Sequence, residues 1–300
     1  MRIKDIQIKG KKYQLVSDFR DNDEIREQFF ELPKTMFCVD FKPWYEAGLW
    51  TEKYNPYCIM DEGKLVSNVS MYHQDFVIDG KVKHLIQLGG VCTYEAYRNR
   101  GLSRYIMEEI IEEYKDQCDS LYLMANDTVL DFYPRFGFEA SKEYQYVTMA
   151  KGSSNTYHAR KLDPKNSEDL KLVETKVGCA SQEIELQTVN QTELVLFYWF
   201  ICDACELRYI EELDTIANVE YRDGQLVIDN VYGDAAIEEV ISALVGKEPI
   251  KVILGFKPKN AEKYEVEEYY EEDTTLFIHN KAFKEEFDSK KLKFVAISHT

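Results

Sequence analysis

The chain has 300 residues, of which 45% are hydrophobic and 13% aromatic, and it carries a formal net charge of −17 at pH 7. This composition supports a sizeable core and excludes a disordered chain, and the length suits two domains of about 150 residues each. Nucleic acids and anionic membranes are bound with Lys and Arg, so the acidic balance argues against both as partners. The charge suits solubility, or attraction of a cationic partner such as an amine.

Three features bear on where the protein works. Residues Met1–Leu15 alternate charged with apolar side chains and lack the apolar core of a signal peptide. The longest apolar run, Leu194–Cys202, has nine residues, which is too short to span a bilayer. Seven cysteines without a framework spacing suit a reducing compartment. We therefore expect a soluble, cytoplasmic protein.

Helices and antiparallel strands are expected at the start of the chain. Asn and Asp residues that can cap helices precede apolar residues at helical spacing, and β-rich runs are separated by turn residues. Asp79-Gly80 is a strong two-residue hairpin signal. The predicted helices are 22–32 and 41–49, and the predicted strands are 57–60, 64–78 and 81–93.

The strand 81–93 leads into the most informative segment of the chain. Gly89-Gly90 in mid-strand predicts a bulge or a close backbone approach. The segment Tyr97–Arg104 then places three arginines and Gly101 before a predicted helix over Leu102–Cys118. A glycine turn at a helix N-terminus presents unpaired N–H groups and the positive end of the helix dipole. The pattern predicts an anion site, most naturally for a pyrophosphate.

A strand over Ser120–Met124, a short helix over about 128–136 and a last strand over Glu143–Met149 complete the first half. Antiparallel strands on one side and a strand–helix–strand unit on the other indicate a mixed α/β sheet. The polar segment Lys151–Asn155 reads as a linker between two domains.

Two motifs resemble those of the GNAT superfamily of N-acetyltransferases. The first is Gly90-Val91-Cys92-Thr93 followed by Arg98-x-x-Gly101-x-Ser103, which is similar to the acetyl-CoA signature of that superfamily. The second is Asn126 followed by Phe132-Tyr133-Pro134-Arg135-Phe136-Gly137-Phe138-Glu139. With the hairpin Val77-Ile78-Asp79-Gly80, residues 1–150 are most similar to the enhanced-intracellular-survival (Eis) type of acetyltransferase.

The resemblance implies a mixed-sheet acyl-CoA N-acyltransferase fold that binds acetyl-CoA as co-substrate, with no metal. The strand before the turn would splay from Ser120–Met124 and bind the pantetheine amides through its main chain, and the turn would hold the pyrophosphate. Ser103 stands where the family usually has Gly or Ala. The expected cofactor-binding residues are Val91, Cys92, Thr93, Arg98, Asn99, Arg100, Gly101, Leu102, Ser103, Arg104 and Asn126.

Tyr133 is the expected catalytic residue. Attack of an amine on a thioester expels a thiolate, and a phenol with a pKa of about 10 can protonate that sulfur. Family members place a tyrosine of this motif there, although alone it would be read as a core aromatic. Some GNAT enzymes place a Glu as base where this chain has Gln87. We assign no base, and His73 and Glu95 are more simply structural or surface residues.

The second half repeats the order strand, strand, helix, strand over 218–221, 226–231, 234–245 and 250–256. Between its second strand and its helix stand Gly233-Asp234, without an arginine. Asp234 is predicted to cap the helix, where its carboxylate would repel a phosphate. We therefore expect a catalytic GNAT domain over 1–152 and a degenerate GNAT-like domain over 155–300, as the Eis resemblance implies. The third, sterol-carrier-like domain of Eis-type enzymes is expected to be missing.

Three other features are read as structural. The Cys202-x-x-Cys205 pair lies inside a predicted helical run over Glu193–Ile210, and core packing explains it better than redox chemistry or zinc. Cys92 is expected to act through its main chain rather than as a nucleophile. The acidic run Glu262–Asp273 alternates with aromatic residues, which predicts a strand with one solvated face and not a metal site.

The sequence therefore predicts an N-acetyltransferase that moves the acetyl group of acetyl-CoA to a primary amine by direct transfer in a ternary complex. The acceptor would lie between the helices at 22–49, the central hairpin and the second half. An aminoglycoside, a polyamine and a lysine side chain all stay open, as does a homo-oligomer. The alternatives are a non-catalytic acyl-CoA-binding or sensing protein, which Gln87 favours, and a purely structural protein.

Overall fold

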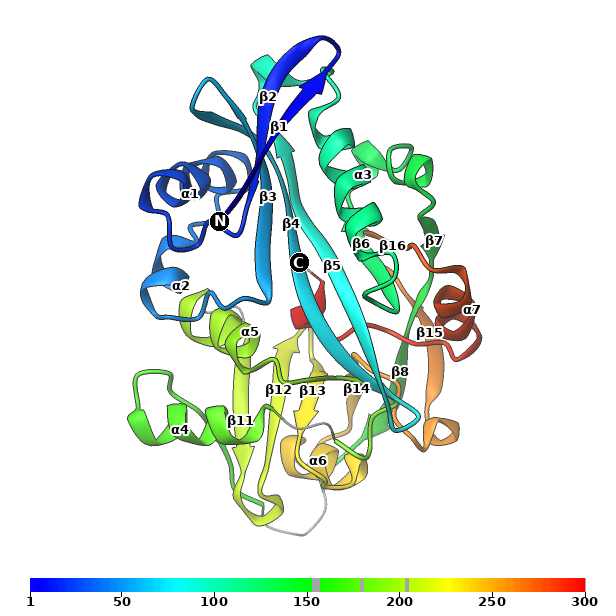
Figure 1. The fold of residues 1–300 in the computed structure, drawn as a ribbon. Coiled ribbons are helices and arrows are strands. Elements are labelled where there is room, and N and C mark those ends of the chain that lie inside the picture. Colours follow the sequence, from blue (N-terminus) through cyan, green and yellow to red (C-terminus); the bar gives the residue numbers. More distant parts are fainter. Residues whose placement is uncertain (153–156, 179–180, 203–204, 300) are drawn as a thin grey trace.

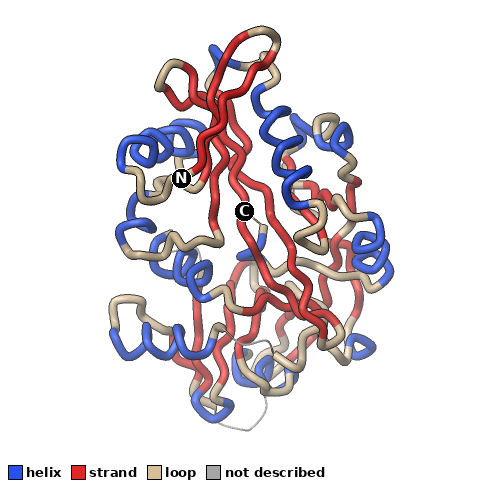
Figure 2. Tube along the Cα trace, in the orientation of Figure 1, coloured by secondary structure: helices blue, strands red, loops and turns tan. Residues whose placement is uncertain are grey.

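The computed structural model of the chain describes residues 1–152, 157–178, 181–202 and 205–299. These residues form two twisted β-sheets that lie one beyond the other, with helices on their faces (Figures 1 and 2). No helix in these ranges is both long and apolar enough to cross a membrane.

The first sheet runs in the order β1-β2-β3-β4-β5-β6-β16-β7, and β10 pairs with the far end of β4. Neighbouring strands are antiparallel except for β5 and β6, which are parallel and are connected through α3. The strands are β1 Arg2–Ile8, β2 Lys11–Ser17, β3 Tyr54–Asp61, β4 Lys64–Ile78, β5 Lys81–Thr93, β6 Ser120–Ala125, β7 Glu139–Ser141, β10 Leu186–Val189 and β16 Thr275–Ile278.

Helices cover both faces of this sheet because its strands alternate apolar residues between two cores. In β3, Tyr57 and Ile59 pack with α3 (Leu102–Tyr114), whereas Cys58 and Met60 pack with α1 (Asp23–Phe37) and α2 (Lys42–Glu46) on the other face. Figure 1 shows α1 and α2 on one side of the sheet and α3 on the other.

The predicted capping and bulge residues are confirmed. The Asn22 side chain accepts a hydrogen bond of 3.0 Å from the Ile25 backbone N–H at the start of α1. In β5, the register against β4 shifts between Gly89 and Cys92, and Gly90 has a φ of +56°. The extra residue is a β-bulge, and the Asn68 side chain donates a hydrogen bond of 2.8 Å to the Gly90 carbonyl.

The second sheet runs in the order β15-β8-β14-β13-β12-β11-β9. Its antiparallel β12–β13 pair, its helix α6 (Ile237–Leu244) and its parallel β13–β14 pair repeat the arrangement of β4, β5, α3 and β6. The predicted repeat is therefore present as a topology. The strands are β8 Glu143–Ala150, β9 Ala159–Lys161, β11 Glu206–Ile210, β12 Thr215–Arg222, β13 Gln225–Tyr232, β14 Ile250–Leu254 and β15 Glu265–Tyr269.

The gap beyond the β13–β14 ladder is filled by the protein's own chain. The ladder ends near the Ile228–Leu254 pair. Beyond it, the Glu185 backbone N–H donates to the Lys257 carbonyl at 2.9 Å, and the Gln187 side chain donates to the Val231 carbonyl at 2.8 Å. This segment bridges the two separated strand ends, so the second sheet offers no open gap there.

The prediction that Asp234 caps the second-half helix is wrong. Helix α6 begins at Ile237, three residues later, and no side chain caps it. The Asp234 carboxylate instead accepts a hydrogen bond of 3.2 Å from the Gln182 backbone N–H. Asp234 therefore anchors the inserted segment, and the absence of CoA binding in this half stays a prediction.

Other elements also differ from expectation. The helix predicted over 22–32 extends to Phe37 in α1, and the helix predicted over Leu102–Cys118 ends at Tyr114 in α3. The run predicted as a helix over Glu193–Ile210 is a short α-helix, α5 (Thr192–Leu196), then a π-helix over Phe197–Ile201, and then strand β11. Leu207 and Ile210 are buried at a spacing that fits a helix, but pairing with β12 and β9 satisfies their backbone. The helix predicted over 41–49 shortens to α2, and the one over 128–136 is two 3₁₀ turns, Asp127–Val129 and Tyr133–Phe136.

The two sheets exchange strands across the predicted domain boundary. Strand β8 precedes the boundary but belongs to the second sheet, while β10 and β16 follow it and belong to the first. Of the predicted linker, Lys151 and Gly152 are described and residues 153–155 lie outside the described residues. The division into 1–152 and 155–300 stays a prediction, and the sheets are interlocked around it.

A buried ion pair lies at the junction of the two sheets. The His299 imidazole lies 3.1 Å from the carboxylate of Glu143 on β8, and both side chains are less than 10% exposed. Burial disfavours the imidazolium, but the charge of Glu143 outweighs this and raises the pKa of His299. Burial likewise opposes the carboxylate, yet His299 and Lys293 lower the pKa of Glu143. An ion pair thus joins strand β8, from the first half of the chain, to His299.

We expect this pair to give the free energy of unfolding a defined pH dependence. The His299 contribution is complete below its ordinary pKa of 6.5 and is lost as pH rises through the raised folded value. The Glu143 contribution is present above its ordinary pKa of 4.5 and is lost as pH falls through the lowered value. Stability from the pair should therefore be greatest between about pH 4.5 and 6.5.

Denaturant unfolding of His299→Gln at several pH values tests this expectation. Removal of one partner from a buried pair should cost about 3–5 kcal/mol near pH 6 and flatten the alkaline decline of the wild type. The control is His158→Gln, because His158 pairs with Glu212 on the surface and should contribute little. An unchanged alkaline decline in His299→Gln would contradict the assignment.

Candidate active site

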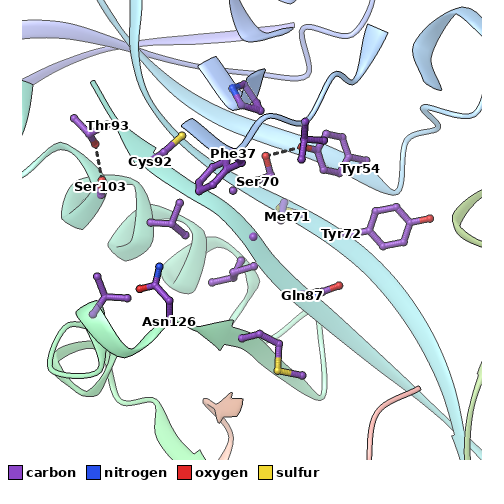
Figure 3. A pocket seen from close by; sticks show the side chains of 18 of the residues that line it. Phe37, Tyr54, Ser70, Met71, Tyr72, Gln87, Cys92, Thr93, Ser103 and Asn126 are labelled. Carbon is purple, nitrogen blue, oxygen red and sulfur yellow. Dashed lines mark hydrogen bonds between the residues drawn. The ribbon is translucent and has the colours of Figure 1, made fainter. Parts of the chain in front are cut away.

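A cavity of about 790 Å³ opens where β5 and β6 separate. Their parallel ladder ends at the Gln87–Tyr122 pair, while β5 continues to Thr93. Residues Gln87–Thr93 of β5 line the cavity, as do Met124 of β6 and Asn126. Figure 3 shows Asn126 across from the Gln87–Thr93 stretch of β5. The predicted splaying of the central strand is therefore present, and it exposes main chain that a ligand with amide groups can bind.

The turn before α3 forms one end of the cavity. Gly101 lies at the helix N-terminus with a φ of +87°, and Asn99 has a φ of +63°. The Arg98 side chain donates to the Thr93 carbonyl at 3.3 Å, and Lys9 on the β1–β2 hairpin donates to the Asn99 carbonyl at 3.0 Å. These bonds hold the turn in place. The first N–H groups of a helix have no partner within the helix, as an anion site requires.

Six of the seven predicted turn residues line the cavity, namely Arg98, Asn99, Gly101, Leu102, Ser103 and Arg104. Arg104 also pairs with Glu108 one helical turn later, at 2.8 Å. The prediction for Arg100 differs from the structure. Its guanidinium donates to the Ala96 carbonyl at 2.6 Å and stacks over the Tyr97 ring, and it is not among the cavity-lining residues.

Ser103 links the turn to the sheet. Its hydroxyl lies 2.8 Å from the Thr93 hydroxyl (Figure 3) and 3.5 Å from the Ser67 hydroxyl. The Thr93 and Ser67 hydroxyls are 2.7 Å apart. A Gly or Ala at position 103 would remove this connection between α3, β5 and β4. The hydroxyl therefore has a structural partner on the sheet.

Cys92 is a poor nucleophile in this setting. The side chain is 5% exposed, and burial raises the pKa of its thiol to about 12. The thiolate, which is the reactive form of cysteine, is therefore scarce at neutral pH. Val91, Cys92 and Thr93 all line the cavity, which agrees with a main-chain role for this stretch of β5.

Tyr133 also lines the cavity, from a 3₁₀ turn beyond β6. Its ring packs against Phe132 and Phe138 and against Phe277 on β16, so a strand from the second half supports its position. Burial raises the pKa of the Tyr133 hydroxyl to about 12. The group is protonated at neutral pH and can donate a proton. Asn126 lies at the same edge, and Thr128 donates to its side-chain oxygen at 2.7 Å.

The position at which some family members have a Glu is neutral and fixed here. The Gln87 side chain accepts from Gln74 at 2.7 Å and donates to the Ser298 carbonyl at 3.2 Å. Gln87 lines the cavity, whereas neither His73 nor Glu95 does. Burial lowers the pKa of His73, which packs against Tyr114.

Aromatic side chains that no sequence motif indicated form another part of the cavity wall, which we call the aromatic end. They come from α1, the loop after it, α2, β3, β4 and the π-helix after α5, so both halves of the chain contribute. The only signal in the sequence is the general richness in aromatic residues. The aromatic residues of this end are Phe37, Phe41, Trp44, Tyr54, Tyr72, Phe197 and Tyr198.

Neither the cysteine pair nor the acidic run forms a metal site in the described part of the chain. No group of three or more His, Cys, Asp or Glu side chains there is arranged to hold a metal ion. Residues 203 and 204, which lie between Cys202 and Cys205, are outside the described residues. Of the acidic run Glu262–Asp273, only Glu265–Tyr269 form a strand, β15, and its side chains are half-buried to exposed.

Residues 21–141 match the family model described as "Acetyltransferase (GNAT) domain". This range contains both motifs and most of the residues that line the cavity, whereas Leu194, Phe197, Tyr198 and Cys202 line it from outside the range. No curated protein gives a significant match to the sequence.

Three solved structures share the fold over most of the chain. A probable N-acyltransferase from Enterococcus faecalis V583 is 13% identical with a TM-score of 0.60, and 89% of this chain and 72% of that chain are covered. A GCN5-related N-acetyltransferase from Kribbella flavida is 15% identical with a TM-score of 0.54, and 89% of this chain and 71% of that chain are covered. Eis1 from Mycobacterium abscessus is 13% identical with a TM-score of 0.55, and 87% of this chain and 73% of that chain are covered. At these identities the likeness shows the fold alone, and it confirms the mixed α/β GNAT fold.

Proposed function

We propose that this protein is an acetyl-CoA-dependent N-acetyltransferase of the Eis type that acetylates a primary amine by direct transfer in a ternary complex. The carrying observation is the cavity between β5 and β6, which has an anion-binding turn at one end and the Tyr133 hydroxyl in its wall. GNAT acetyltransferases use acetyl-CoA as co-substrate and act on amines, which agrees with this geometry.

The residues present fit coenzyme A. The N–H groups at the start of α3, with Arg98 and Arg104, would bind the pyrophosphate, because the helix dipole and the guanidinium groups favour anions there. The main chain of Val91–Thr93 would pair with the pantetheine amides in the gap beside β6. Bound acetyl-CoA would supply an activated acetyl group and a thiolate leaving group.

Catalysis would rest mainly on positioning, since both reactants lie in one cavity. The amine nitrogen forms a bond to the thioester carbonyl carbon, the carbon–sulfur bond breaks, and the nitrogen loses one proton. Tyr133 would donate its hydroxyl proton to the leaving sulfur and recover one from solvent, and its raised pKa keeps it protonated until then.

Release of free thiol from acetyl-CoA over a panel of amines tests the function. We expect release with at least one amine, together with a rise in Tm on adding CoA. CoA binding without release for any amine would instead favour the second candidate, an acyl-CoA sensor, which the neutral Gln87 supports. Absence of CoA binding would contradict both.

Replacing Cys92 tests direct transfer. Cys92→Ala should keep kcat within about threefold, because the buried thiol with a pKa of about 12 is not the nucleophile. Loss of a buried side chain should lower stability by roughly 1 kcal/mol. Steady-state kinetics measure the first effect, and mass spectrometry after incubation with acetyl-CoA alone should show no acetyl group on Cys92. A loss of turnover beyond 100-fold with intact folding would indicate an acetyl-cysteine route.

A further inference from the structure

We propose that the acceptor is an amine carried on an aromatic or otherwise apolar body, such as an arylalkylamine, and that this body binds in the aromatic end of the cavity. The inference rests on the proposed function and adds the class of its substrate. It separates the acceptors left open by sequence, because an aminoglycoside or polyamine presents several charges and little apolar surface.

The aromatic end is a preformed surface. The rings of Phe41 and Phe197 stack with centroids 6.0 Å apart and planes 19° apart. The Trp44 ring packs edge-on against Phe197, with a centroid distance of 5.5 Å, and against Tyr54, with a centroid distance of 5.1 Å. Phe41 and Trp44 come from around α2 and Phe197 from the π-helix after α5, so the packing of the two halves builds this wall. A rigid aromatic wall binds an aromatic ligand with little loss of conformational entropy.

Charge at the cavity argues in the same direction. The charged side chains among its described lining residues are Arg98 and Arg104, at the turn. Tyr72 of the aromatic end donates a hydrogen bond of 3.1 Å to the carboxylate of Glu193. That carboxylate already forms an ion pair with Lys53 at 2.7 Å. A polycation would lose its hydration there without gaining a carboxylate partner, whereas an apolar amine desolvates a single charge and buries its body.

The same surroundings favour the reactive form of the amine. An apolar environment disfavours an ammonium and lowers its pKa, so a larger fraction is the neutral amine that attacks. The transfer is R–NH₂ plus acetyl-CoA giving R–NH–CO–CH₃ plus CoA thiol. The new C–N bond replaces the C–S bond, and the proton lost by nitrogen balances the one gained by sulfur. An acceptor that is already partly neutral needs no general base, which is consistent with Gln87 at the position where some family members have a Glu.

Figure 3 shows Phe37, Tyr54 and Tyr72 on the same side of the β5 strand as Gln87. Phe37, at the end of α1, is 46% exposed although it lines the cavity. A charge there should therefore alter the cavity without disturbing the core. Phe200 on the π-helix is a matched control, because it is 43% exposed and is not among the cavity-lining residues.

The experiment compares kcat/KM for phenylethylamine and tryptamine with that for spermidine and ethanolamine, in the wild type, Phe37→Glu and Phe200→Glu. We expect the apolar amines to exceed the others by at least tenfold, which corresponds to about 1.4 kcal/mol. Phe37→Glu should reduce this ratio at least tenfold, and Phe200→Glu should leave it within about twofold. The rise in Tm with CoA should be the same for all three proteins.

The outcomes separate this inference from the proposed function. Faster turnover of spermidine than of the apolar amines would overturn the inference and leave an N-acetyltransferase. An unchanged ratio in a folded, CoA-binding Phe37→Glu would also overturn it. Turnover of no amine in the presence of CoA binding would overturn the proposed function itself.

Discussion

Replacing Gly101 with Asp should abolish CoA binding. Gly101 has a φ of +87°, which costs a non-glycine residue about 1–2 kcal/mol. Space is not the obstacle, because an added Cβ would meet only Ile8 and Lys9, at 3.7 and 3.9 Å. The main effect is electrostatic. A carboxylate at the start of α3 would occupy the N–H groups meant for the pyrophosphate and repel it by about 4 kcal/mol at a separation of 4 Å. We expect Kd to rise on the order of a thousandfold.

Isothermal titration with CoA measures this effect, and Gly224→Asp is its control. Gly224 has a φ of +71°, has nothing within 4 Å of an added Cβ, and lies in the β12–β13 hairpin of the second sheet. It therefore experiences the same backbone strain without the anion site, and its CoA affinity should match that of the wild type. Normal CoA binding by Gly101→Asp would show that the pyrophosphate binds elsewhere.

Replacing Tyr133 with Phe should lower kcat by about 10²–10⁴-fold and leave the Kd of CoA within about twofold. The substitution removes only the hydroxyl, whose proton we assign to the leaving sulfur. The packing of the ring on Phe277, at a centroid distance of 5.8 Å, is retained, so the cavity keeps its shape. Single-turnover kinetics separate this loss from product release.

Tyr144→Phe is the matched control for this substitution. Tyr144 lies on β8 beside Lys291 and is not among the cavity-lining residues. Its kcat should equal that of the wild type. If Tyr133→Phe keeps full turnover, another group or water protonates the sulfur. A parallel loss of CoA affinity would instead indicate that the Tyr133 hydroxyl serves binding rather than proton transfer.

Local sequence patterns predicted the elements that form the turn end of the cavity. The Asn22 cap, the bulge at Gly90, the hairpin at Asp79-Gly80 and the turn at Gly101 were all correct, because each depends on the conformational preference of one or two residues. The parallel strand pair around α3 also follows from local order, since a strand, helix and strand in sequence pack in one way. Local patterns did not predict where the Arg100 side chain lies, because its position depends on contacts with the Tyr97 ring and the Ala96 carbonyl.

The elements that surround the turn end of the cavity could be identified only from long-range contacts in the folded protein. The pairing of β16 with β6 supports Tyr133, and the pairing of β8 with β14 interlocks the sheets. The segment that fills the gap beside β13, and the aromatic end that two halves of the chain build together, follow from contacts between distant residues. Local periodicity records which face of an element is apolar, but it does not record which distant element covers that face. Local patterns were therefore enough to predict the fold of the central unit and the glycine turn before α3. The aromatic end of the cavity depends on long-range packing, because its side chains are buried by partners that lie more than a hundred residues away in the chain.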